Sequence, residues 1–171
     1  MLRFDQFKKD IKVKFSDLPP MVPLSSNVWR FDEAFYVWFT HEKTTYRINL
    51  PTGFITDFAS IPRALWWLVQ KWDYKYTPAC LPHDLGYEKL GKLTLWRPFN
   101  GVYTPLTAKL SRKALDDLMY YGMVARGVPA WKRALIYSGV RVGGGFAWKK
   151  HEKRSKKIIP RPVALSHRIR G

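Results

Sequence analysis

The sequence predicts an α+β fold: a small antiparallel sheet in the N-terminal half, packed on a helical half of about four helices, with a basic C-terminal tail. Three observations lead to this prediction. Residues 34–40 and 44–50 are rich in aromatic and β-branched side chains and flank a short turn, which indicates a β-hairpin. From Ser60 onward, capping and breaking residues bracket segments of helical length. The hydrophobic fraction of 46% over 171 residues is typical of a globular chain.

The sheet is expected to lie before residue 57. Residues 1–27 predict an N-terminal arm, or a short strand, followed by a proline-rich loop, because lysines alternate with apolar residues and three prolines follow. The hairpin at 34–50 comes next, and a third strand is expected at 53–56.

Four helices are expected after the sheet. They cover residues 60–70, Pro78–Leu90 ending at Gly91, a segment capped by Ser111 and stopped by Gly127, and a segment opened by Pro129 and closed by Gly143–Gly145. Between the second and third helices, about twenty residues containing two prolines and an Asn-Gly pair predict a long loop. Such a loop would serve as a lid or a substrate wall.

Length and charge restrict the organisation and the partners. The chain has the length of one domain, expected at residues 28–148, and its net charge is +17. Residues 149–171 carry nine Lys or Arg against one Glu, so +8 of that charge lies in the tail. A positive field attracts nucleic acid, anionic lipid or acidic protein. We expect no transmembrane insertion, because the longest apolar run (Ala64–Val69) is far too short to span a bilayer.

The candidate site centres on His83, followed by Asp84 and Tyr87. Positions i and i+4 share a helix face, so His83 and Tyr87 would point the same way. In the next helix Asp116 could accept a ring N–H from His83 and orient it as a general base, while Asp117 would face outward. These three residues, His83, Asp116 and Tyr87, are the catalytic candidates. The alternative is a buried structural network.

The sequence names no cofactor. The spacing of the four histidines and one cysteine excludes a zinc motif, and Cys80 is expected in the core. A divalent cation, calcium or magnesium, would need carboxylates, for which Asp84 and Asp57 are the candidates. The alternative for Asp57 is to accept backbone N–H bonds at a strand-to-helix junction.

Four ordered segments resemble a family of phage and prophage proteins catalogued as domain of unknown function 1353, over roughly residues 45–148. They read LPTGFITDFASIPRALWW, TPACLPHDLGYEKL, SRKALDDLMYYGM and GVPAWKRALIYSGVRVGG. The polar positions that recur in that pattern are Asp57, Ser60, His83, Asp84, Tyr87, Arg112 and Asp116, and Leu115 replaces a usual alanine. The resemblance implies a bacteriophage virion or assembly protein. It would be made in the bacterial host cytoplasm and located in the particle, with its tail and aromatic surface on other virion proteins or DNA.

The HDLGY and LDD segments also look like the active-site segment of secretory and parvoviral phospholipases. That resemblance implies that His83 activates water, Asp84 binds calcium and Asp116 steadies the histidine. The glycine-rich calcium loop of those enzymes has no counterpart here. Two functions from different classes are therefore expected: a virion component, or a metal-assisted hydrolase whose small-molecule substrate the sequence does not name.

Overall fold

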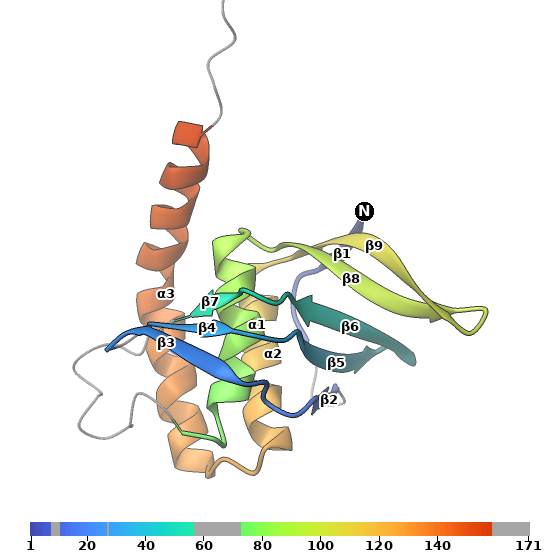
Figure 1. The fold of residues 1–171 in the computed structure, drawn as a ribbon, viewed down its shortest axis with the longest axis horizontal. Helices are drawn as coiled ribbons and strands as arrows, with labels where there is room; N and C mark the ends of the chain where they lie inside the picture. The colour runs from blue at the N-terminus through green and yellow to red at the C-terminus, as the bar shows by residue number, and fades with distance from the viewer. Residues whose placement is uncertain (8–10, 27, 57–72, 159–171) are drawn as a thin grey trace, which may run out of the picture.

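The computed structural model describes residues 1–7, 11–26, 28–56 and 73–158. It confirms the predicted fold class: a curled sheet, mostly antiparallel, lies beside three helices in the described part of the chain (Figure 1). The helix expected at residues 60–70 lies outside the described residues.

Nine strands form two sheets in the described residues. The larger sheet has the order β1-β9-β8-β6-β5-β2, with only β1 and β9 parallel, and the smaller has the order β3-β4-β7. The large sheet contains β1 (Leu2–Phe4), β2 (Lys12–Phe15), β5 (Phe35–His41), β6 (Thr44–Leu50), β8 (Lys92–Phe99) and β9 (Val102–Leu110); the small sheet contains β3 (Met21–Ser25), β4 (Val28–Phe31) and β7 (Ile55–Thr56).

The predicted hairpin is confirmed as β5 and β6. Its turn residues Glu42 and Lys43 both have positive φ, as in the tight turns that match strand twist. Burial alternates along both strands, so that one face joins the core. The N-terminal segment is also part of the sheet, since β1 pairs with β9 and β2 pairs with β5. The expected proline-rich loop contains β3, which pairs with β4.

The long loop expected between the second and third helices was wrong, because residues 92–110 form the hairpin of β8 and β9. Its turn is Asn100-Gly101, with φ of 49° and 77°, a pair that strongly favours a two-residue hairpin turn. Pro98 and Pro105 suggested a loop. Both lie where their strand has no second neighbour, since β6 pairs at residues 95–96 of β8 and β1 pairs at residues 108–110 of β9. A proline is tolerated at such an edge.

The helices are α1 (Thr77–Glu88), α2 (Arg112–Ala125) and α3 (Ala130–Ile158). The Ser111 cap of α2 is confirmed, because its hydroxyl accepts from the Ala114 N–H at 3.0 Å. The expected end of the last helix at Gly143–Gly145 was wrong, since α3 continues through these glycines. None of the described helices has the length and apolar character needed to cross a bilayer.

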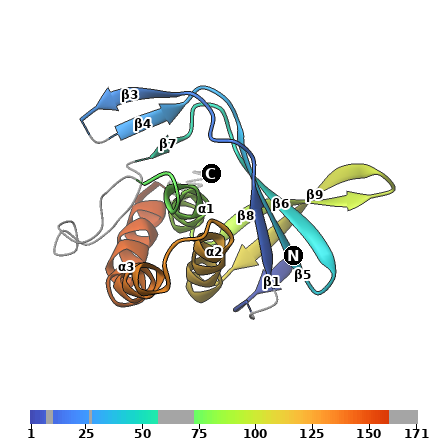
Figure 2. The ribbon, with the colours of Figure 1, turned by 90° about the horizontal axis from the view of Figure 1, so that it is seen from below.

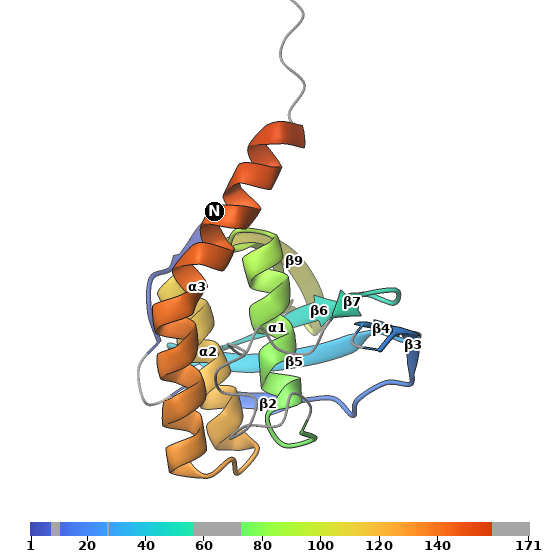
Figure 3. The ribbon, with the colours of Figure 1, turned by 90° about the vertical axis from the view of Figure 1, so that its left-hand side faces the viewer.

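Packing places α1 and α2 against one face of the large sheet, and α3 packs on both helices (Figures 1 and 2). Side chains of the sheet and of α1 and α2 share the main core, in which Leu50, Leu81 and Leu115 are fully buried. A second core, with Cys80, Met119 and Ile136, holds the three helices together. The C-terminal part of α3 extends beyond the rest of the fold (Figure 3).

Candidate functional site

Three helices converge on one buried carboxylate, that of Asp116 on α2. Asp116 is fully buried, and its Oδ1 accepts two hydrogen bonds from α1: His83 Nε2 lies at 2.9 Å and the Tyr87 hydroxyl at 2.8 Å. One helical turn separates His83 from Tyr87, which puts them on the same face, and their rings lie 4.2 Å apart. The structure thus brings together the three residues expected to carry the chemistry.

The other carboxylate oxygen of Asp116, Oδ2, is contacted by a residue of α3. Arg141 donates from Nη1 to Oδ2 at 2.6 Å, and Arg112 Nη1 lies 4.0 Å from the same atom. Burial raises the pKa of the Asp116 carboxyl, but the bonds from His83, Arg141 and Tyr87 outweigh burial, and the pKa lies below its usual value. Asp116 is therefore ionised at neutral pH.

The bonding of Asp116 determines the tautomer of His83. An ionised carboxylate only accepts hydrogen bonds, so Nε2 carries the hydrogen and Nδ1 is left as the basic atom. Nδ1 lies 3.7 Å from Asp84 Oδ1, and Asp84 Oδ2 accepts from the Thr56 hydroxyl at 3.3 Å. Burial lowers the pKa of His83, yet the two carboxylates outweigh burial and raise it above 6.5. The imidazole thus lies between two carboxylates that favour its protonated form.

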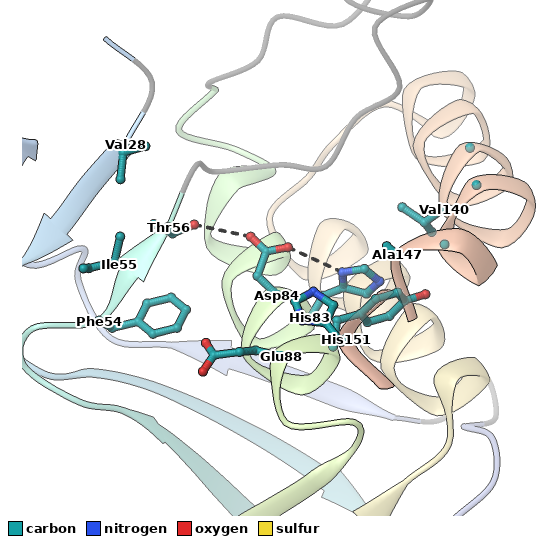
Figure 4. A pocket seen from close by; sticks show the side chains of 14 residues that line it. Val28, Phe54, Ile55, Thr56, His83, Asp84, Glu88, Val140, Ala147 and His151 are labelled. Carbon is teal, nitrogen blue, oxygen red and sulfur yellow. Dashed lines mark hydrogen bonds and ion pairs between the residues drawn. The ribbon is translucent and has the colours of Figure 1, made fainter. Parts of the chain in front are cut away.

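A pocket of about 510 Å³ opens beside this network (Figure 4). His83, Asp84, Tyr87 and Glu88 reach it from α1, so the base and its neighbours lie on its wall. The remaining wall is mostly apolar, which is the usual character of a small-molecule site. It consists of Val28, Phe54, Ile55 and Thr56 from the small-sheet region and of Gly139, Val140, Gly143, Gly144, Ala147 and His151 from α3.

The glycines of α3 let this helix approach the site. A Cβ at Gly144 would lie 2.5 Å from the Tyr87 hydroxyl and 3.3 Å from Arg112 Nη1. Gly144 therefore serves close helix packing, and the Gly143–Gly145 run lies inside α3 instead of ending it. A similar contact explains Leu115: a Cβ at Gly86 would lie 2.3 Å from its side chain, so glycine provides the room for the larger leucine.

Asp117 does not face outward as expected, because it is buried like Asp116. Its Oδ2 accepts from the Phe7 backbone N–H at 3.1 Å and from Lys113 at 2.7 Å, and its Oδ1 accepts from the Tyr137 hydroxyl at 2.7 Å. Burial and the charge of Asp117 raise the pKa of Tyr137 to about 12. Asp117 thus connects the N-terminal segment, α2 and α3.

The other candidates are placed as follows. Asp57 and Ser60 lie outside the described residues. Within the described residues, no three His, Cys, Asp or Glu side chains form a group that could hold a metal ion. Cys80 is a buried core residue, as expected, and burial raises the pKa of its thiol.

Sequence reasoning missed Arg141, the strongest charged partner of Asp116, and Thr56, which holds Asp84. The signal available for Arg141 was its spacing: it follows Tyr137 by four residues, so the partners of both aspartates lie on one face of α3. Thr56 gave no comparable signal.

A comparison with known protein families finds a match that covers most of this site. A family model described as "Protein of unknown function (DUF1353)" matches residues 29–140, which include His83, Asp84, Tyr87 and Asp116. No curated protein and no solved structure matched the chain. Since the match covers more than half of the 171 residues, the chain belongs to the DUF1353 family of proteins of unknown function.

Proposed function

We propose that the protein is a hydrolase in which His83 is the general base that activates water against an ester or phosphoester bond. One observation carries the proposal: His83 Nε2 lies 2.9 Å from the buried carboxylate of Asp116, while the same ring lines a pocket of about 510 Å³. A carboxylate on one ring nitrogen fixes the tautomer and leaves the other nitrogen as the base. This is the role that the likeness to phospholipases implies for both residues.

The chemical steps follow from the two ring nitrogens. His83 Nδ1 takes a proton from a water molecule as its oxygen attacks the carbonyl or phosphoryl centre. The imidazolium that forms is stabilised by Asp116 and by Asp84, whose Oδ1 lies 3.7 Å from Nδ1. The same proton then passes to the departing alcohol oxygen, which restores neutral His83. Tyr87 and Arg141 keep Asp116 ionised and in place throughout.

Assistance by calcium or magnesium is part of the proposal, with Asp84 as a ligand. The described residues do not complete a set of three acidic, histidine or cysteine ligands, and Asp57 lies outside them. No step is therefore assigned to the ion. Thermal unfolding with calcium, magnesium and manganese tests this part: Asp84→Asn should remove any stabilisation by the ion, because a neutral amide binds a hard cation weakly.

The test of the hydrolase uses nitrophenyl esters, phospholipid vesicles and a phosphodiester as substrates. His83→Ala and Asp116→Asn should each lower turnover at least about 100-fold, since the first removes the base and the second its ionised partner. His151→Ala is the matched control, because this second histidine lines the same pocket, and it should retain most of the activity. The proposal would be contradicted if turnover survived His83→Ala, or if the wild-type protein turned over none of these substrates.

A second role is compatible with the first: we propose a bacteriophage virion or assembly component that binds neighbouring subunits, or DNA, through its basic C-terminal region. The phage assignment rests on the sequence resemblance. The supporting structural observation is that α3 runs to Ile158 and extends beyond the fold (Figure 3). Lys149, Lys150 and Lys153 line a groove near its end. Phe146, next to them, is 82% exposed.

The virion role is tested in a phage or prophage that encodes this chain. Mass spectrometry of purified particles should find the chain at a constant ratio to the major capsid protein, and truncation after Trp148 should remove it from particles. Its recovery only outside purified particles would contradict a virion location. Retention of the truncated chain would contradict the role of the tail.

A further inference from the structure

The Lys and Arg residues of the large sheet have no acidic neighbours within its strands. Its six strands contain seven Lys or Arg residues and no Asp or Glu, although the whole chain has 13 acidic residues. The helices lie on one side of this sheet, and no described helix covers its other face (Figure 2). In the described part of the chain, a sheet face whose strands carry no carboxylate presents a positive field, which favours a polyanionic partner.

The strand register aligns planar side chains across this uncovered face. Lys14 on β2 is paired with Trp38 on β5, Trp38 with Arg47 on β6, and Arg47 with Trp96 on β8. The alternating residues Val37, Phe39, Ile48 and Leu95 face the core, so the row points away from it. Trp38 and Trp96 stand two strand spacings apart, about 10 Å. The sheet thus presents two indole rings with a guanidinium between them.

Arg47 is held by aromatic rings alone in the described part of the chain. Its guanidinium carbon lies 4.2 Å from the Tyr103 ring centre, 5.1 Å from Tyr36 and 5.7 Å from Trp96. Its buried Nε has no hydrogen-bond partner within the described residues. Among the described residues, no carboxylate therefore neutralises the charge of Arg47, which lies over aromatic rings instead.

Beside this row lies a groove of about 510 Å³, lined by Lys12, Lys14, Phe15, Trp38, Thr40 and Thr45. It combines a ring for stacking, two ammonium groups and two hydroxyls. Across the sheet, Arg3, Lys109 and Lys92 are neighbours on β1, β9 and β8, and the Lys109 ammonium turns toward the helices, where it donates to the Leu90 carbonyl and lies 6.0 Å from the Trp148 ring. Like charges on adjacent strands are destabilising without a counterion. Burial, Lys92 and Arg3 together lower the pKa of Lys109.

We propose that this face binds single-stranded nucleic acid, with bases stacked on Trp38 and Trp96 and phosphates on Lys12 and Lys14. Stacking requires bases that are not already paired, which favours a single strand over a duplex. The absence of carboxylates from the six strands favours a polyanion over a neutral sugar. DNA and RNA share this chemistry. The proposal concerns a surface other than the His83 pocket and does not depend on hydrolase activity.

The test measures binding of the full chain to fluorescein-labelled dT12 and U12 by anisotropy, with a duplex of the same length and heparin as competitors. Trp38→Leu should raise the Kd for a single strand at least about fivefold, since stacking contributes about 1–3 kcal/mol per base. Lys12→Gln with Lys14→Gln should reduce the slope of log K against log salt by about 1.4. A preference for dT12 or U12 would identify the source of the strand.

Two matched control variants distinguish binding at this face from nonspecific attraction to positive charge elsewhere on the protein. Trp131→Leu removes an exposed tryptophan from α3, and Lys89→Gln with Arg126→Gln removes two exposed charges from the ends of α1 and α2. Circular dichroism should show that all variants are folded. The proposal is overturned if the duplex or heparin binds more tightly than the single strands, or if the control variants weaken binding as much as the variants of the sheet face.

Discussion

At the scale of single residues, the site depends on the hydrogen bonds that one buried carboxylate accepts. Asp116 is fully buried and accepts from His83, Tyr87 and Arg141, which come from two other helices. A buried carboxylate left without such partners is strongly destabilising, because its desolvation is not compensated. The three donors therefore stabilise the fold and, by the same contacts, set the protonation of His83.

The raised pKa of His83 predicts the pH dependence of stability. A group whose pKa is higher in the folded than in the unfolded state stabilises the fold fully below its unfolded pKa of 6.5, and this stabilisation is lost as the pH rises through the folded pKa. Urea unfolding should therefore show a free energy of unfolding that falls above pH 6.5. His83→Gln, which does not titrate, should abolish that fall, and an identical profile in the variant would contradict the raised pKa.

The pKa of Asp116 is lowered, so its contribution has the opposite sign. It is present above the unfolded pKa of 3.8 and is lost as the pH falls through the lower folded pKa.

If the protein is a hydrolase, the fraction of His83 in the neutral, basic form increases as the pH rises, so kcat/KM should increase through an apparent pKa above 6.5. A profile that declines over this range would contradict a role as general base.

At the scale of elements, α3 is the part that completes the site. Two adjacent glycines of α3 have different surroundings. Gly144 faces the Tyr87 hydroxyl, whereas a Cβ at Gly145 would meet no atom within 4 Å in the described residues. The first glycine therefore serves packing, and the second only weakens the helix.

Substitution of these two glycines should have effects of opposite sign. Gly144→Ala should destabilise by about 1 kcal/mol, because displacing the Tyr87 hydroxyl from Asp116 leaves a buried acceptor short of a partner and outweighs the gain in helix propensity. Gly145→Ala should stabilise by roughly 0.5–1 kcal/mol. Chemical unfolding of both variants checks this, and equal effects would contradict the proposed contact between α3 and Tyr87.

At the scale of the whole molecule, Asp117 joins segments that are far apart in the sequence. It accepts from the Phe7 N–H, 110 residues away, and from Tyr137 on α3. Asp117→Ala should destabilise by about 3 kcal/mol, because the buried Phe7 N–H and the half-buried Tyr137 hydroxyl lose their acceptor. Faster hydrogen exchange of the Phe7 amide would locate the effect. Asp5→Ala, an exposed aspartate in the same N-terminal segment, should change stability by less than about 0.5 kcal/mol.

Much of the fold could be predicted because it is encoded by local signals. The hairpin of β5 and β6, the Ser111 cap of α2 and the shared face of His83 and Tyr87 all depend on residues close together in the chain. The pairing of His83 with Asp116 could also be anticipated, since each lies on one of two helices expected to be neighbours. The Asn-Gly turn of β8 and β9 was a local signal too, but two prolines concealed it.

Tertiary structure decided the rest, because the same local pattern is compatible with several environments. Gly143–Gly145 reads as a helix end, yet it lies inside α3, where Tyr87 leaves no room for a side chain at Gly144. Asp117 reads as a solvated neighbour of Asp116, yet it is buried because the N-terminal segment and α3 bring donors to it. The sequence by itself determined the fold class, the hairpin of β5 and β6, the start of α2 and the shared face of His83 and Tyr87. Only long-range packing determined which polar groups are buried together, because their partners come from distant segments.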